Sequence, residues 1–340
     1  MLQFTIKVLS HLFGILCTST TLIPFFMGTS TFKEFLRKLS LTQGQFILVS
    51  IALLALISIT CFVQHLFTSK KAENCGNAFN NFHEKLIAAV FEMRKKNAEQ
   101  LEYSTHTAFY EFAKLRCQEL CEYIAKFIKH KYGKDFSVCI KMIDKKSIDK
   151  VKRTGRIGDA EVYTFCRGGC SHDFRERNEK ERATYDTLGK NHFCIPVRDN
   201  SDFYSILSDD EINKATTMFA CSNLRMNARL SEILGRPEYR NSTPKYWKYY
   251  KSTVVVPIQV EKKFVAAKED ESLVGIYQTV GFLCIDYKKT ISTAMLNELA
   301  GYLKGFGDSF YPLFHEIAIT DRKIAQFEAR NEHLKGGVGS

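Results

Sequence analysis

The stretches Ser-Thr-Val-Val-Val-Pro-Ile at residues 252–258 and Val-Gly-Phe-Leu-Cys-Ile-Asp-Tyr at residues 280–287 decide the fold of this chain. Both are apolar and rich in β-branched or aromatic residues, a composition that favours β-strands over helices. Neither is long enough to form a typical isolated helix, and each is followed by polar residues that end it. We therefore predict a β-sheet that contains both stretches.

Further strand patterns occur upstream of these two stretches, and helical patterns flank them. A helix is expected to close the domain at about residues 292–317, and residues 174–187 are charged and helical in composition. The basic stretch at 145–156 is predicted to be a solvated loop, with phosphate binding by its basic side chains as the alternative. The remaining strands are predicted at residues 136–143, 161–167, 193–197 and 217–224.

A long helical stalk is predicted before the first strand. Residues 77–131 contain neither Pro nor Gly, and apolar residues recur there at intervals of three and four, as in amphipathic helices. Ser104 or Thr105 can cap a second helix, so two consecutive helices are favoured over one. Gly133 is expected to end the second helix, because Gly is preferred just past a helix end.

Two apolar segments near the N-terminus are expected to cross a membrane. Residues 46–63 are 18 residues without a charge, and with the residues that follow they reach the length of a bilayer span. Residues 8–28 also lack Asp, Glu, Lys and Arg, and a true span is favoured over a cleaved signal peptide because no small-residue cleavage site follows. The connection, residues 29–43, is short, so we predict a helical hairpin.

Cysteine usage predicts that the larger domain lies on the cytoplasmic side, and the net charge indicates which partners it favours. The formal net charge is +11, which favours anionic partners such as lipid headgroups, nucleotides or nucleic acid. The eleven Cys have no framework-like spacing, so free thiols in a reducing compartment are expected. The apolar hairpin makes the lipid bilayer the first expected partner.

The strand patterns at 252–258 and at Gly281-Phe282-Leu283-Cys284-Ile285-Asp286 resemble the two adjacent C-terminal strands of a GAF domain. The resemblance covers residues 105–318 and includes the flanking helices. It implies an α+β fold: an antiparallel sheet with helices on one face and a ligand pocket on the other, serving as a sensor or dimerisation module. The Asn-Lys-Phe-Asp-Glu motif of cyclic-nucleotide-binding members is absent, and no cysteine matches a bilin attachment site.

The complete plan resembles two-transmembrane effectors of bacterial antiphage systems of the retron or cyclic-oligonucleotide type. That resemblance implies a bacterial inner-membrane protein whose GAF-like domain controls a membrane-perturbing hairpin in a homo-oligomer. The alternative is a passive membrane-tethered adaptor that regulates a partner enzyme, and a nucleic-acid-containing partner complex is a further possibility. The domains are a hairpin at 1–68, a stalk at 69–104, the GAF-like domain at 105–318, and a polar helix with a flexible tail at 319–340.

Two groups of residues are candidates for these roles. Hydroxyl, imidazole and proline groups in the first apolar segment could line a pore, because such groups are tolerated in membrane helices. Guanidinium and aromatic groups suit a small anionic or nucleotide ligand, although packing against the sheet is the alternative. The membrane-active candidates are His11, Thr18, Thr20 and Pro24, and the ligand-binding candidates are Arg167, Asn223, Arg225, Trp247 and Asp286.

Catalytic and metal chemistry are weakly indicated. The best metal pattern is Cys166, Cys170 and His172, but zinc usually takes four ligands, so Cys139 or Cys194 would have to supply the fourth. Ordinary hairpin cysteines are the stronger interpretation. The chain has no nucleophile elbow, no phosphate-binding glycine loop and no zinc-protease motif. We therefore expect neither an enzyme, a bound metal nor a cofactor.

Overall fold

The computed structural model describes residues 34, 37, 42–98, 106–168, 194–208, 218–233, 239–242, 246–259, 279–320 and 323. The chain divides into two compact units, Met1–Glu73 and Asn74–Ser340. Helix α3 (Gln43–Ala98) contributes residues to both units. It is continuous across residue 68, where the sequence suggests a boundary between the hairpin and the stalk. The predicted first span, with its membrane-active candidates, lies outside the described residues.

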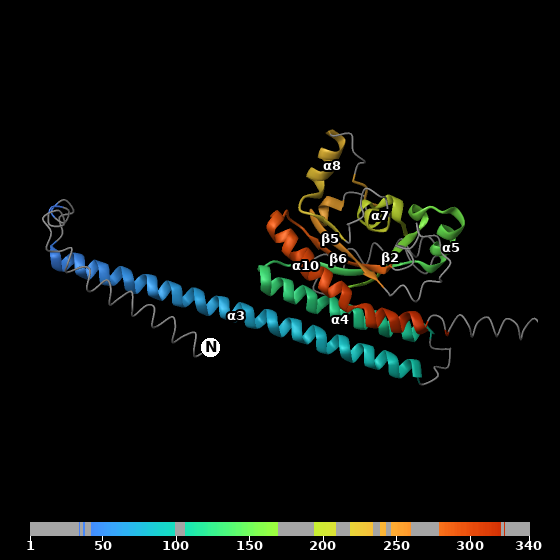
Figure 1. Ribbon diagram of the computed structural model, residues 1–340, viewed down its shortest axis with the longest axis horizontal. Coiled ribbons are helices and arrows are strands. Elements are labelled where there is room, and N and C mark those ends of the chain that lie inside the picture. The colour runs from blue at the N-terminus through green and yellow to red at the C-terminus, as the bar shows by residue number, and fades with distance from the viewer. Residues whose placement is uncertain are drawn as a thin grey trace, which may run out of the picture. The chain divides into compact units, whose positions relative to one another are not determined.

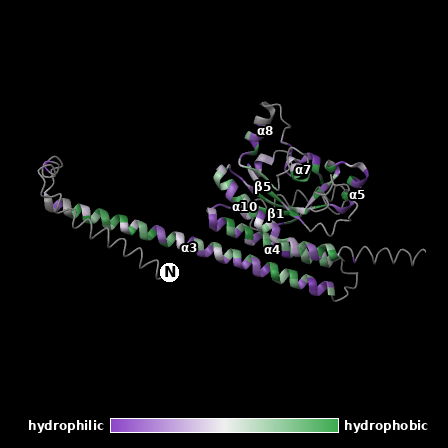
Figure 2. Cartoon of the chain, in the orientation of Figure 1, coloured by the Kyte–Doolittle hydropathy of each residue, from purple (hydrophilic) through white to green (hydrophobic). Residues whose placement is uncertain are grey.

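In the N-terminal unit, α3 begins at a capping box and continues as an apolar helix. Thr42 N donates to Gln45 Oε1 (2.9 Å) and Gln45 N donates to Thr42 Oγ1 (3.3 Å), which satisfies two donors at the helix start. By length and composition, this helix could cross a membrane: Leu48–Ala98 contains an 18-residue window of mean hydropathy 2.1, none of it buried. Figure 2 shows the N-terminal part of α3 as mostly hydrophobic and the later part as mixed, with many hydrophilic residues.

The C-terminal unit is built on a six-stranded sheet in the order β3-β2-β1-β6-β5-β4. Every neighbouring pair is antiparallel. The two stretches that decide the fold are the neighbouring strands β5 and β6, as their resemblance to a GAF domain implies. The strands are β1 (Ser137–Ile143), β2 (Glu161–Arg167), β3 (Ile195–Pro196), β4 (Phe219–Cys221), β5 (Ser252–Gln259) and β6 (Thr279–Tyr287).

Alternation along the central strands gives the sheet two covered faces. In β6, Leu283 and Ile285 join one buried core, while Phe282 and Cys284 join another. Successive side chains of a strand point to opposite faces, so the two cores lie on opposite sides of the sheet. This explains why β6 is apolar at nearly every position.

Helices α4 (His106–Tyr132) and α10 (Thr293–Ser309) cover one face of the sheet, as Figure 1 shows. The part of α3 from Asn74 onward shares their core, for example through Phe82, whose ring centroid is 4.8 Å from that of Phe306. A further helical stretch, 311–320, follows α10. Gly133 ends α4 as predicted: its φ is 65°, and its N–H donates to Lys129 O (2.7 Å).

The other face is covered by α5 (Lys145–Thr154) and α7 (Ser201–Leu207). The prediction of a loop over the basic stretch is wrong, because α5 occupies it. Asp144 caps the helix start by accepting from Ser147 N (3.0 Å), and Gly155 ends the helix at φ 66°. Together with the helices on the opposite face, this architecture is consistent with a GAF-like α+β domain.

The outer strands are shorter than their sequence patterns suggest. Within the described residues, β3 has two residues and β4 has three. The three described residues of β4 pair with Thr253, Val254 and Val255 of β5.

Candidate functional site

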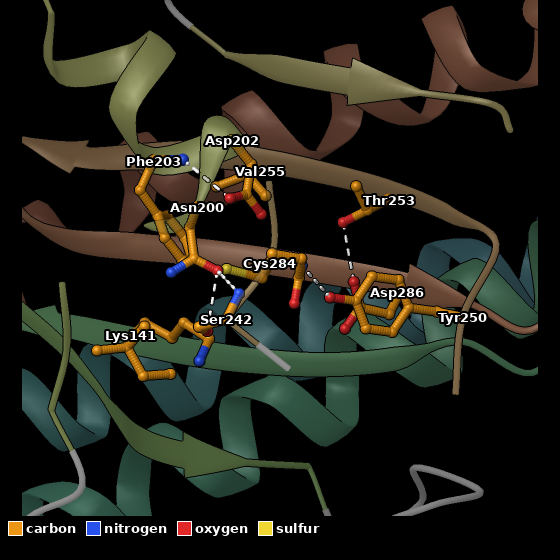
Figure 3. A pocket seen from close by; sticks show the side chains of 12 residues that line it. Lys141, Asn200, Asp202, Phe203, Ser242, Tyr250, Thr253, Val255, Cys284 and Asp286 are labelled. Carbon is orange, nitrogen blue, oxygen red and sulfur yellow. Dashed lines mark hydrogen bonds between the residues drawn. The ribbon is translucent and has the colours of Figure 1, made fainter. Parts of the chain in front are cut away.

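A small pocket lies on the sheet face opposite α4 and α10, between the sheet and α7 (Figure 3). Its cavity volume is about 20 Å³, which is room for roughly one water molecule. Polar groups dominate the lining, in contrast to the apolar core on the opposite face. The lining residues are Lys141, Ile195, Asn200, Asp202, Phe203, Asn241, Ser242, Tyr250, Thr253, Val255, Cys284 and Asp286.

Asp202 of α7 is one of the buried carboxylates that line the pocket. The residue is only 5% exposed. Its Oδ1 accepts a hydrogen bond from Phe203 N (3.1 Å). Burial raises the pKa of Asp202 to about 7, and the nearby charge of Asp286 adds to the rise, while the Phe203 N–H and Lys141 oppose it.

A second carboxylate, Asp286 of β6, enters the same pocket and is 6% exposed. Its Oδ1 accepts a hydrogen bond from Thr253 Oγ1 (2.8 Å) of β5, the cross-strand neighbour of Asp286. Lys141 of β1 adds a cation: its Nζ donates to Thr164 Oγ1 (3.2 Å) and lies 5.8 Å from the Phe203 ring centroid. The pocket therefore contains charges of both signs.

Hydrogen bonds from Asn200, at the start of α7, fix the segment that contains Asn241 and Ser242 against the pocket. Asn200 Oδ1 accepts from Ser242 N (3.2 Å) and Ser242 Oγ (3.1 Å). Asn241 Nδ2 donates to Tyr250 Oη (2.7 Å), which ties the loop to a buried aromatic cluster that includes Tyr246. The polar residues Asn241 and Ser242 are therefore held in place by the buried aromatic cluster next to them.

The pocket brings together only part of the predicted ligand set. Asp286 lines it, and Arg167 is buried on the same sheet face, beside Cys139, without being among the lining residues. Asn223 instead caps α8 (Leu224–Ile233), because its Oδ1 accepts from Met226 N (3.1 Å). Arg225 of α8 is exposed, and Trp247 is 44% exposed; neither lines the pocket.

Sequence reasoning missed Asp202 and Lys141, two of the charged residues in the pocket. Asp202 lies in the first turn of a helix, where an acidic residue is ordinary, so only the fold reveals its burial. Lys141 offered a weak signal, because it interrupts an otherwise apolar strand, Val-Cys-Ile-Lys-Met-Ile, at residues 138–143.

The cysteines separate into different parts of the fold. Cys166 of β2 pairs with Ile140 and faces the helix side, whereas Cys139 faces the pocket side, so Cys139 cannot complete a metal site with Cys166. No group of three or more potential metal ligands occurs among the described residues, which exclude Cys170 and His172. Among the described cysteines, free thiols are present as predicted at Cys61, Cys117, Cys121, Cys139, Cys166, Cys221 and Cys284.

No protein-family model matches the chain, and no curated protein matches it. Solved structures that the chain matches include the GAF domain of A. Aeolicus nlh2 in an inactive state, with 10% identity over 69% of this chain and 98% of that one, at a TM-score of 0.33. The GAF domain of an Acinetobacter phosphoenolpyruvate-protein phosphotransferase has 9% identity over 69% and 97%, at 0.27. Bacteriophytochrome RpBphP3 of R. palustris has 7% identity over 76% and 42%, at 0.29. Similarity at this level carries no information on ligand or activity.

Proposed function

We propose that the chain is a membrane-tethered sensor whose domain at residues 105–318 binds a small ligand in the pocket beneath α7. The observation that carries this proposal is the buried polar lining of the pocket. Burying carboxylates such as Asp202 and Asp286 costs stability unless a partner compensates for the lost water. A lining of this kind is typical of binding sites, in which a few polar groups fix the orientation of a ligand.

The central strands offer a route from the pocket to the helices. In β5, Thr253 and Val255 line the pocket, while Val254 and Val256 pack in the core with α10. A ligand that shifts β5 would therefore change the packing of α10. Because packed cores respond in discrete steps rather than by smooth deformation, such a shift can act as a signal.

A pocket-filling variant tests the sensor proposal. Ser242 lies at the wall of the pocket, and Ser242→Trp should occlude it. We expect native mass spectrometry of the full chain to detect a bound small molecule in the wild type and to lose it in this variant. A small-molecule extract of the source cells should raise the melting temperature of the wild type alone. If the extract changes neither protein and neither carries a bound molecule, the sensor proposal fails.

Two outputs are compatible with this proposal, and they differ in what the membrane segments do. In the first, residues 1–68 form a two-span hairpin in the bacterial inner membrane, and a homo-oligomer of such hairpins perturbs the bilayer when the sensor is triggered. An antiviral role belongs to this form and rests on the sequence resemblance. In the second, the same segments only anchor an adaptor that regulates a separate enzyme.

Expression of the full chain and of a version lacking residues 1–68 separates these outputs. The effector form predicts a fall in membrane potential that requires residues 1–68 and appears in liposomes containing the purified chain. The adaptor form predicts an intact potential and stable co-purification with an enzyme. Depolarised liposomes would exclude the passive adaptor.

A further inference from the structure

Two cysteines face each other across the centre of the sheet, on the side that carries the pocket. Cys139 of β1 and Cys284 of β6 are directly opposed in the antiparallel pairing of these strands, and both are almost fully buried. The thiol of Cys284 donates a hydrogen bond to the sulfur of Cys139. Directly opposed residues of an antiparallel pair have Cα atoms about 4.5–5.5 Å apart, within the range of about 4.4–6.8 Å that disulfides span. The backbone is therefore already placed for a covalent bond between the two sulfurs.

Positive charges on the same sheet face favour the thiolate form of this pair. Arg167 of β2 is the neighbour of Cys139 on its other side, and Lys141 follows two residues later on the same face of β1. The hydrogen bond from Cys284 and these two cations lower the pKa of Cys139 to about 7, against its burial and the charge of Asp286. Burial raises the pKa of Cys284 well above its usual value. Since the thiolate is the reactive form of cysteine, the pair is prepared for oxidation.

The pocket gives a small oxidant access to one of the two sulfurs. Cys284 is among the residues that line the cavity (Figure 3). The cavity volume of about 20 Å³ suits a molecule close in size to water, such as hydrogen peroxide. A bulky disulfide such as oxidised glutathione does not fit this volume. A peroxide is therefore the class of oxidant that matches the site.

A second cysteine cluster, on the opposite face of the sheet, lacks such access. Cys117 and Cys121 of α4 share hydrogen bonds with Cys166 of β2, and all three are buried in the apolar core. Although burial opposes it, these hydrogen bonds lower the pKa of Cys166 to about 5. None of the three lines the pocket. This cluster would react first if thiol acidity alone decided the outcome, so it is an internal reference for the pair.

We propose that Cys139 and Cys284 form a reversible cross-strand disulfide when a peroxide enters the pocket. In the reactive state the pair holds one proton, on Cys284. This proton passes along the hydrogen bond to Cys139, and the Cys284 sulfur attacks one peroxide oxygen. The O–O bond breaks, which leaves a sulfenic acid on Cys284 and a hydroxide that takes the proton of Cys139 to become water.

The second step closes the disulfide. The Cys139 thiolate attacks the sulfur of Cys284, the S–O bond breaks, and the departing hydroxide takes a proton from solvent to form a second water. The two sulfurs lose two electrons, and the peroxide is reduced to two water molecules. The bond joins the two central strands beside the pocket, and its formation does not depend on the ligand proposed above.

Peptide mapping of the full chain in detergent micelles tests the proposal. The native protein is treated with hydrogen peroxide, its remaining thiols are blocked with N-ethylmaleimide, and it is digested without reductant. We expect a linked pair of peptides that contain Cys139 and Cys284, about 2 Da lighter than the two reduced peptides together, and its loss after treatment with dithiothreitol. Cys117→Ser is the matched control, because it removes an equally buried thiol from the opposite face; it should form the same link.

Two further variants separate the steps. In Cys139→Ser, the sulfenic acid on Cys284 has no thiol partner, so dimedone should label Cys284 in this variant and not in the wild type. Ser242→Trp should occlude the pocket and slow the formation of the link by about tenfold or more, because a thiol without access to solvent is inert.

Three results would overturn the proposal. The first is a link from Cys166 to Cys117 or Cys121 in place of the expected one, which would show that thiol acidity decides the reaction. The second is recovery of Cys284 as its N-ethylmaleimide adduct, without a link, from peroxide-treated native protein. The third is an unchanged rate in Ser242→Trp, which would exclude the pocket as the route of the peroxide. None of these results bears on the bound small molecule that tests the sensor proposal, so the two ideas fail separately.

Discussion

At the scale of single residues, Asp202 links the stability of the domain to pH. Its folded pKa of about 7 lies above the ordinary value of 3.8, so the folded state keeps a proton that the unfolded state releases. The stabilising contribution of this proton is complete below about pH 4 and disappears as the pH rises through 7, a change of about 4 kcal/mol at most. We expect Asp202→Asn to abolish this loss.

Thermal unfolding of the ligand-free full chain in micelles, followed from pH 5 to pH 9, measures the effect. The melting temperature of Asp202→Asn should exceed that of the wild type by an amount that grows up to about pH 7 and is then constant. Asp199→Asn should follow the wild type at every pH. A variant less stable than the wild type at pH 8 would show that the carboxylate stabilises the fold, in contradiction to this account.

Gly281 provides a second prediction at this scale. A Cβ at Gly281 would overlap the carbonyl oxygen of Lys141 on the neighbouring strand, whereas a Cβ at the exposed Gly305 of α10 meets nothing within 4 Å. Gly281→Ala should lower the free energy of unfolding by about 2 kcal/mol or more, because two central strands must separate. Gly305→Ala should raise it by about 0.5–1 kcal/mol through helix propensity. Equal effects of the two substitutions on the melting temperature would refute the close approach at Gly281.

The candidate site also shows where residue-level prediction from sequence stops. Asp286 belongs to the Gly-Phe-Leu-Cys-Ile-Asp stretch that resembles a GAF domain, and in the structure it lines the pocket. Asn223 was assigned to a ligand although its side chain caps a helix, since a capping Asn and a binding Asn look alike in sequence. Asp202 was missed because burial of its carboxylate depends on packing between α7 and strands far away in the chain.

At the scale of elements, a polar cluster joins the end of α3 to the stretch 311–320. The buried Glu316 accepts from Arg94 Nε (2.7 Å) and from Asn97 Nδ2 (3.1 Å). Thr320 Oγ1 donates to Asn97 Oδ1. These hydrogen bonds add specific polar contacts to the apolar core that the two helical segments share.

Glu316→Ala tests the importance of this cluster. It removes the carboxylate that accepts from Arg94 Nε and Asn97 Nδ2 and leaves Asn97 only the backbone carbonyl of residue 316 (3.3 Å). The substitution should lower the free energy of unfolding by about 2 kcal/mol. Glu111→Ala is the matched control, because Glu111 is exposed and its contact with Lys114 is 3.9 Å long; a change below about 0.5 kcal/mol is expected there. Similar melting temperatures for the two variants would show that the polar cluster does not stabilise the helix pair.

Elements were predictable where an apolar pattern marked them. Strands β1, β5 and β6 are buried on both faces, so their sequences are nearly continuous apolar runs. Helix α5 lacked such a pattern, because Ser147 and Val151 are its only buried residues and most of the others are charged. Its start and end signals, Asp144 and Gly155, were present in the sequence, but the basic composition favoured a loop.

At the scale of the whole molecule, membrane association should depend on the apolar part of α3. Leu56 is 62% exposed within this segment, as expected for a side chain that faces lipid. Leu56→Arg should cost about 2.5–3.5 kcal/mol of insertion free energy if it lies near the bilayer centre. We expect a larger fraction of this variant to be extracted from membranes by carbonate. Ala72→Arg, at an exposed position beyond the apolar run, is the control and should stay in the membrane.

The number of spans determines on which sides of the membrane the two ends of the chain lie. Two spans, 8–28 and 46–63, place the N-terminus and the sensor domain on the same side, whereas one span places them on opposite sides. We expect the two-span arrangement, since 8–28 contains no Asp, Glu, Lys or Arg and the connection is short. Epitope tags at both termini should then be cleaved together by protease in inside-out vesicles and be protected together in spheroplasts. Protection of the N-terminal tag alone in inside-out vesicles would establish a single span, and the hairpin effector would then lose its structural basis while the tethered sensor would not.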